Sequence, residues 1–336
     1  MSNSINRRQF LGNSLAVSTG AGILAQSFEE KHLLAQSTSA SKVPGLQAAE
    51  GLPQGTIKGL NISRLICGGN LISGFAHSRD LIYVSPLLKQ YFTDEKILDT
   101  LENAESNGIN TAILRCDQKT VNILKKYREE RGGTIQWIAQ TYIKENDTKT
   151  NIRLAIDNGA VAAYTHGGIG DNFVRKGRVD LIGDAVAFIK DNGLPGGVAG
   201  HCIEVQKACE KDAIGADFYM KTFHKDDYWS ATPKALRKPW DTGGKNYQDH
   251  TKHHDNIWVD DTEKTAAFMA TVNKPWIAYK VLAAGAIHPS QGFTYAFANG
   301  ADFICVGMFD FQITEDAIIT KQALAGDLNR TRPWYA

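Results

Sequence analysis

The chain has 336 residues, of which 43% are hydrophobic and 22% charged. This is enough apolar material for one large α/β domain or two small ones. The 37 basic and 36 acidic side chains almost cancel, so the charge gives no reason to expect nucleic acid or an anionic membrane surface as a partner. A small neutral or modestly charged ligand fits this balance better.

Residues 1–40 are predicted to form a signal and linker, and residues 41–336 a single domain. The segment Asn6-Arg7-Arg8-Gln9-Phe10-Leu11-Gly12 opens a weakly apolar run that reaches Ala25, and it resembles a twin-arginine export signal. The resemblance implies a bacterial protein that folds in the cytoplasm, meets the twin-arginine export machinery and works in the periplasm. The run is too short and too polar for stable membrane insertion. The alternative is a chance Arg-Arg pair ahead of an amphipathic helix.

The remaining chain divides into eight pairs of a strand and a helix. Short apolar runs predict strands at residues 63–69, 111–116, 135–142, 160–165, 197–201, 217–222, 275–282 and 301–308. Amphipathic stretches predict the helices that follow them, at residues 94–107, 119–131, 148–158, 178–192, 203–213 and 262–272, from residue 289 and from about residue 314.

Eight such units predict an α/β fold of the closed parallel type, a (β/α)8 TIM barrel. The alternative is an open doubly wound sheet. That fold usually carries GxGxxG after its first strand, and Gly68-Gly69-Asn70 is a poor substitute. The five cysteines are an odd number without a CxxC motif, so they are expected to be small core residues and not a disulfide framework.

Two connections are much longer than the usual few residues. They span residues 70–93 after the first strand and 223–261 after the sixth. Long ordered loops at the carboxyl ends of barrel strands usually build the site. Both are therefore expected to cover the barrel mouth.

Three segments resemble the aldo-keto reductases, which are barrels that use a nicotinamide cofactor. These are Ile62 to Asn70 with a predicted hairpin at residues 55–61, Ala104 to Ala112, and Ala163 to Gly167. The resemblance implies an oxidoreductase that acts on a small, sugar-like carbonyl or hydroxyl compound, with NADP as a cofactor. It also implies that His166 is the family's substrate-side histidine.

The other members of that family's catalytic tetrad have no counterpart in this sequence. Ile113 stands where the family has aspartate, Gln118 where it has tyrosine, and Gln140 where it has lysine. Residues 307–312, where the family holds the cofactor's adenosine phosphate, contain no Arg or Lys. Shared fold ancestry is therefore better supported than shared chemistry.

Polar side chains at the ends of apolar strands are the candidate site residues, because barrel sites lie at that face. The candidates for catalysis are His166, Lys280, His224 and Lys221, and those for substrate binding are Asn70, Arg115, Gln140, Trp229 and Asp310. Asp117 and His201 occupy similar positions. The alternative for each residue is a buried polar group that only satisfies its neighbours.

Lys280 is distinctive because it places an ammonium group inside an apolar predicted strand, within the run Trp276 to Leu282. Burial lowers the pKa of a lysine, which makes it a base or a Schiff-base nucleophile. The alternative is an ion pair with Asp310 or another carboxylate at a strand end. Lys221 presents the same two alternatives.

The long sixth connection contains histidines and aspartates that could bind a divalent metal. The candidate ligands are His224, Asp227, His254 and Asp255. The alternative is a polar lid whose tryptophans, Trp229 among them, pack against flat sugar-like faces.

Three functions follow from these features. The first is an exported barrel enzyme related to the aldo-keto reductases. The second is a lyase, isomerase or aldolase that depends on Lys280 or on a metal. The third is a barrel that binds a small ligand without turning it over.

Overall fold

A computed structural model describes residues 51–75, 81–240 and 259–336, and Gly51–Ala336 form one compact unit. The predicted export signal and the metal candidates His254 and Asp255 lie outside the described residues. None of the helices within these ranges is both long and apolar enough to cross a membrane.

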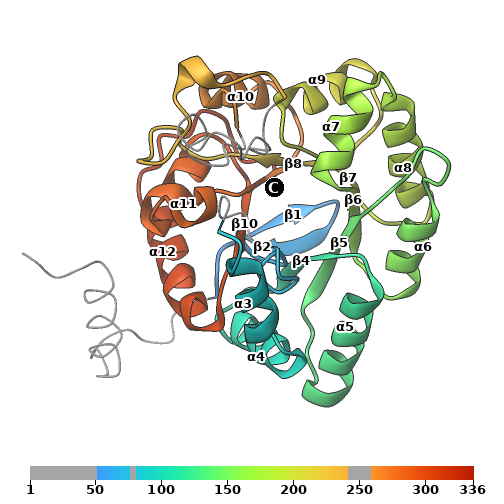
Figure 1. Cartoon of the computed structure of the whole chain (residues 1–336), viewed down its shortest axis with the longest axis vertical. Helices are drawn as coiled ribbons and strands as arrows, with labels where there is room; N and C mark the ends of the chain where they lie inside the picture. The colour runs from blue at the N-terminus through green and yellow to red at the C-terminus, as the bar shows by residue number, and fades with distance from the viewer. Residues whose placement is uncertain (1–50, 76–80, 241–258) are drawn as a thin grey trace, which may run out of the picture. The chain divides into compact units, whose positions relative to one another are not determined.

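The eight predicted strands form a closed parallel barrel, which confirms the predicted fold (Figure 1). In chain order they are β3 (Leu65–Gly68), β4 (Thr111–Arg115), β5 (Gln136–Thr141), β6 (Ala162–Thr165), β7 (Gly196–Gly200), β8 (Phe218–Thr222), β9 (Trp276–Tyr279) and β10 (Phe303–Gly307). Each strand pairs with its sequence neighbour, and β10 closes the ring by pairing with β3 through Cys305↔Ile66 and Val306↔Cys67.

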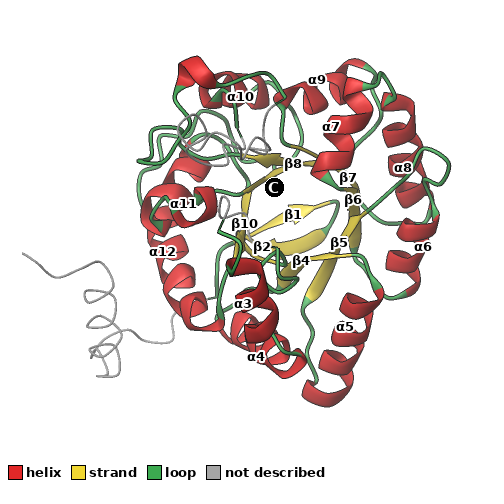
Figure 2. Ribbon diagram, in the orientation of Figure 1, coloured by secondary structure: helices red, strands yellow, loops and turns green. Residues whose placement is uncertain are grey.

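The helices form an outer ring around the strands (Figure 2). They are α3 (Val84–Tyr91), α4 (Asp94–Ser106), α5 (Gln118–Arg131), α6 (Thr150–Asp157), α7 (Gly167–Arg175), α8 (Val179–Asp191), α9 (Ile203–Lys211), α10 (Thr262–Met269), α11 (Pro289–Ala298) and α12 (Ile313–Ala325). Short 3-10 turns precede α10, α11 and α12, namely η1 (Lys234–Leu236), η2 (Ala283–Gly285) and η3 (Asp310–Gln312).

Two helices were not predicted from the sequence. α3 begins beside a proline in the first long connection, and α7 follows β6 with three glycines among its first four residues. Glycine and proline are poor helix formers, so sequence pattern alone predicts loops there. Packing against the barrel overrides this local preference.

The apolar core has two shells, because side chains alternate along each strand. One face of the strands packs against the helices, for example Leu65 and Ala278. The other face fills the barrel interior, where Ile66 and Phe303 meet residues of an antiparallel hairpin, β1 (Gln54–Ile57) and β2 (Leu60–Ser63). Figure 1 shows this predicted hairpin lying across the centre of the ring.

The chain end packs against the same interior and is held by a buried carboxylate. Asp302 is fully buried and accepts hydrogen bonds from the main-chain N–H groups of Trp276 (3.0 Å) and Tyr335 (2.9 Å). The guanidinium groups of Arg330 and Arg332 lie 3.8 and 3.5 Å from its oxygens. Asp302 therefore joins β9, β10 and the C-terminal tail.

Replacing Asp302 by alanine should lower the free energy of unfolding by about 3–5 kcal/mol, because two arginines lose a buried counter-charge. Denaturant unfolding measures this. Asp191→Ala, at an exposed position at the end of α8, is the control and should change the value by less than about 0.5 kcal/mol. A loss below about 1 kcal/mol for Asp302→Ala would show that the tail is held in another way.

Candidate functional site

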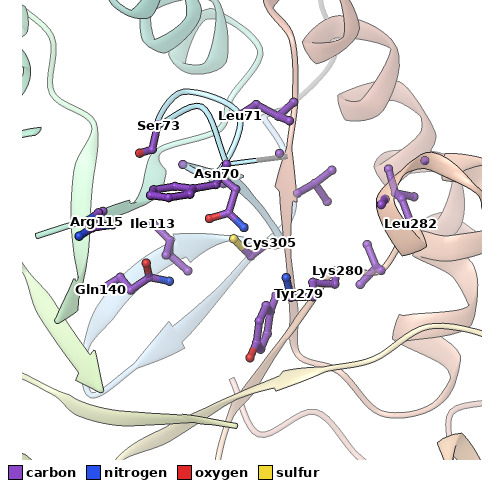
Figure 3. Close-up of a pocket in the computed structure, with 18 of the residues that line it drawn as sticks. Asn70, Leu71, Ser73, Ile113, Arg115, Gln140, Tyr279, Lys280, Leu282 and Cys305 are labelled. Carbon is purple, nitrogen blue, oxygen red and sulfur yellow. The ribbon is translucent and has the colours of Figure 1, made fainter. Parts of the chain in front are cut away.

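A cavity of about 340 Å³ opens at the carboxyl ends of the strands (Figure 3). Four predicted site residues line it: Asn70, Arg115, Gln140 and Lys280. They come from the ends of β3, β4, β5 and β9. The structure therefore brings these four strand-end side chains together at one cavity.

The first long connection contributes much of the cavity wall, as predicted. Residues 70–75 fold into tight turns, with Ser73 N–H donating to the Gly69 carbonyl (2.9 Å) and Phe75 N–H to that of Asn70 (2.9 Å). These turns place Leu71, Ser73 and Phe75 against the cavity, and α3 adds Val84 and Leu88. The second long connection includes residues 241–258, which lie outside the described residues.

Gln140 lies between two tyrosines. Its amide N–H donates to the Tyr164 hydroxyl (2.9 Å), and its carbonyl oxygen accepts from the Tyr142 hydroxyl (2.9 Å). Burial raises the pKa of both phenols, so both stay protonated at neutral pH. This wall of the cavity therefore offers neutral hydrogen-bonding groups.

Arg115 extends the same wall. Its guanidinium lies 4.5 Å from the ring centre of Tyr142 and 5.3 Å from that of Phe75. Its Nε also pairs with the Asp117 carboxylate at 3.3 Å. Arg115 is thus held by two rings and one carboxylate, and its charge is partly balanced before any ligand binds.

His166 stacks on the Tyr142 ring, with the ring centres 4.7 Å apart and the planes at 22°. It caps α7, since its Nδ1 accepts a hydrogen bond from the Gly168 N–H (3.1 Å). Burial, helped by the nearby charges of His201 and Lys280, lowers the pKa of His166 to about 3. The ring is therefore neutral with its proton on Nε2, which makes it a hydrogen-bond donor and a poor base.

Lys280 directly follows β9 and lines the cavity. Burial lowers its pKa to about 7, against a small opposing effect of Cys305. Its backbone is left-handed (φ 59°), as are those of Ala283 (φ 45°) and Ala284 (φ 57°). Such strain in residues other than glycine costs energy and tends to occur at functional sites.

The predicted alternative partner of Lys280 is engaged elsewhere. The Asp310 carboxylate accepts a hydrogen bond from the Tyr91 hydroxyl and pairs with Lys96 at 3.0 Å. Asp310 therefore joins η3 to α3 and α4 and is not among the described residues that line the cavity.

Lys221, the second lysine candidate, is fully buried. Its ammonium donates to the main-chain carbonyls of His201 (2.5 Å) and Thr222 (2.8 Å) and to the Thr222 hydroxyl (3.0 Å). Burial lowers its pKa to about 8. These bonds tie β8 to the end of β7, so Lys221 is a buried polar group satisfied by carbonyl and hydroxyl oxygens and not by the predicted carboxylate.

Sequence reasoning missed Asp171, which lies on the unpredicted helix α7. Its carboxylate accepts from His201 Nδ1 (2.6 Å) and from the main-chain N–H groups of His201 (2.9 Å) and Cys202 (3.1 Å). Burial lowers the pKa of His201, and the Asp171 carboxylate opposes this shift. The carboxylate can only accept, so Nδ1 carries the proton and Nε2 is left as the basic nitrogen.

A glycine makes this pair possible. A Cβ on Gly170 would lie 2.3 Å from the Ala199 carbonyl oxygen, so only glycine lets α7 approach β7 this closely. The closeness of Gly167, Gly168 and Gly170 in the sequence is the one signal that marks a helix pressed against the barrel rim.

The predicted metal site is incomplete among the described residues. His224 is buried, its Nδ1 donates to the Lys225 carbonyl (2.6 Å), and burial lowers its pKa to about 4. Asp227 is exposed and pairs with Lys225 at 3.3 Å. Within the described ranges no three His, Cys, Asp or Glu side chains are grouped to hold a metal.

Trp229, which was predicted to bind substrate, is 77% exposed.

No known family profile matches the chain, and no curated protein matches it. Solved structures, in contrast, do match the structure of this chain. One, described provisionally as an aldo-keto reductase from Pseudomonas aeruginosa, has a TM-score of 0.55 at 15% identity, covering 81% of this chain and 94% of that one. A second structure with the same description has a TM-score of 0.53 at 14% identity, covering 81% and 96%. At this identity the likeness shows the fold.

Asp171→Asn should change the protonation of the His201 ring. Loss of the carboxylate should lower the pKa of His201 further and remove the preference for the Nδ1–H form. Long-range ¹H–¹⁵N NMR of the histidine rings measures both, with Asp227→Asn as a matched exposed control. An unchanged His201 tautomer in Asp171→Asn would contradict the assigned hydrogen bond.

Proposed function

We propose that this chain is an enzyme that acts on a small, sugar-like carbonyl or hydroxyl compound in the barrel-mouth cavity, with Lys280 as the reacting group. The observation that carries the proposal is the position of Lys280. Its amine has a pKa of about 7 and lines a cavity at the carboxyl face of the barrel, where barrel enzymes place their reacting groups.

The reaction proposed is imine formation. The unprotonated Lys280 amine attacks the carbonyl carbon of the ligand, and the resulting carbinolamine loses water to give a Schiff base. An imine withdraws electrons from the neighbouring carbon, which favours lyase, aldolase or isomerase chemistry. Asn70 and Gln140 line the same cavity and supply hydrogen bonds for hydroxyl groups of the ligand.

Tyr279 is suited to assist this step. Its hydroxyl is buried and has no hydrogen-bond partner among the described residues, and its ring centre lies 5.9 Å from the Lys280 ammonium nitrogen. Burial holds the pKa of Tyr279 well above its usual value, so the phenol keeps its proton. It can therefore donate a hydrogen bond to the carbonyl oxygen of the ligand and satisfy its own donor by doing so.

Redox chemistry with a nicotinamide is the second candidate, favoured by the fold likeness to proteins described as aldo-keto reductases. The described residues fit this cofactor poorly. After β10 the polar lining residues are Gln312 and, in the first turn of α12, Asp316, and a carboxylate repels a phosphate. The described cationic lining residues, Arg115 and Lys280, come from other strands.

We also propose export to the periplasm, because residues 6–12 resemble a twin-arginine signal. Replacing Arg7 and Arg8 together by lysine should leave the full-length protein in the cytoplasm, because the signal is read through its arginine pair. Cell fractionation and immunoblotting measure this, with Arg128→Lys on α5 as the control. Unchanged export of the double variant would refute twin-arginine export.

Lysine trapping tests the proposed reaction. Glycolaldehyde and sodium cyanoborohydride should modify Lys280, and peptide mass spectrometry should locate the added mass. At pH 8 about 90% of an amine with a pKa of about 7 is unprotonated, against less than about 1% for an ordinary lysine. The initial rate should fall about fifty-fold between pH 7 and pH 5, as the amine gains its proton.

Lys280→Met should abolish the rapid labelling, whereas Lys125→Met, at an exposed position on α5, should not. If the two variants label equally, and Lys125→Met shows no lysine that reacts faster than its exposed lysines, Lys280 is excluded as the reacting amine. Native mass spectrometry with NADPH tests the redox candidate in parallel, since a stoichiometric complex would favour it.

A further inference from the structure

Asp316 is a buried carboxylate that the proposed reaction does not use. It lies in the first turn of α12, is 3% exposed and lines the cavity. None of the described residues donates a hydrogen bond to its carboxylate or forms an ion pair with it. Burial, and to a smaller extent the neighbouring charge of Glu315, raises its pKa to about 7.

The other buried aspartates in the described ranges are well compensated. Asp302 has two main-chain donors and two arginines, as described above. Asp217 accepts from the Gly196 N–H (3.0 Å) and lies 3.5 and 3.3 Å from the ammonium groups of Lys58 and Lys190. Asp316 is the exception among the three, and an uncompensated buried charge destabilises a fold.

No structural role that we find among the described residues accounts for the free-energy cost of burying the Asp316 carboxylate. A carboxylate in the first turn of a helix interacts well with the helix dipole, but Glu315 is exposed in the same turn and does this without burial. The two described cations of the cavity lining do not compensate Asp316 either, since Arg115 pairs with Asp117 and Lys280 forms no ion pair with Asp316.

The lining from the elements nearest to α12 in the fold carries no cation. Val84 and Leu88 from α3, Val306 from β10 and Phe309 after it are apolar, and Gln312, four residues before Asp316, is a neutral amide. A hydroxyl group could donate one hydrogen bond to the carboxylate but would leave its charge unbalanced. An ammonium group supplies both the donors and the opposite charge, and this pairing is strong where water is excluded.

We propose that Asp316 binds a primary ammonium group of the ligand, so that the cavity takes a small carbonyl compound that also carries an amine. The carbonyl part of this statement rests on the proposed function. The ammonium part rests on Asp316 and its surroundings alone.

The test uses the full folded chain with n-butylamine hydrochloride as probe and 1-butanol as its neutral counterpart of the same size. Isothermal calorimetry and thermal unfolding at pH 8 measure binding. The amine should bind at least about tenfold more tightly than the alcohol. Asp316→Asn should remove this preference, and Glu315→Gln, which deletes an adjacent exposed charge, should keep it.

The stability of Asp316→Asn without ligand gives a second measurement. A carboxyl group whose pKa is raised on folding begins to destabilise the protein when the pH rises above the pKa of that group in the unfolded chain. The destabilisation reaches its full size once the pH is above the pKa of the group in the folded protein. At pH 8 the variant should therefore melt at a higher temperature than the wild type. A lower melting temperature would show a structural role for the carboxylate and overturn the proposal.

Equal binding of amine and alcohol to the wild type, or unchanged amine binding to Asp316→Asn, would also overturn it. Lys280→Met separates this inference from the proposed function, because that variant should lose aldehyde trapping and retain amine binding. If the wild type shows no trapping but prefers the amine, the imine chemistry fails and the ammonium site stands.

Discussion

Closure of the barrel between β10 and β3 is the constraint on which the rest of the structure depends. It places the carboxyl ends of all eight strands on one rim, so that residues as distant in sequence as Asn70 and Asp316 face one cavity. The opposite end is filled by the β1–β2 hairpin and the chain terminus, whose residues Ile57, Ile62 and Ala336 pack into the barrel interior. The polar groups that are not needed for folding are thereby gathered at the carboxyl rim.

Two pairs of buried polar groups differ in where their compensation comes from. Lys221 and Asp302 are satisfied by main-chain groups and fixed charges, so they stabilise connections between strands. The hydroxyl of Tyr279 and the carboxylate of Asp316 face the cavity without a described partner. Desolvation without compensation destabilises the free protein, and a ligand that supplies the missing partner recovers that free energy on binding.

Sequence pattern was sufficient for the strands because their apolar runs are nearly continuous, as expected for a sheet covered on both faces. It also placed Asn70, Arg115, Gln140 and Lys280 at the cavity. It could not separate Lys221 from Lys280, since both follow apolar residues and differ only in whether main-chain carbonyls lie within reach. Asp171 and Asp316 were missed because helices carry them to the rim, and a helix register does not reveal which of its acidic residues points inward.

The likeness to solved barrels concerns the backbone, so only the side chains at the rim bear on the chemistry. On the β5 and β6 side, Gln140 lies between two neutral phenols and burial keeps His166 uncharged. That wall can orient a ligand through hydrogen bonds, but it holds no group that titrates near neutral pH. Lys280, with a pKa of about 7, directly follows β9, which is four strands away from β5 in a ring of eight and so lies across the barrel. In the proposed reaction the ligand is therefore attacked from the side of β9 and oriented from the opposite wall, an arrangement that needs no change of fold.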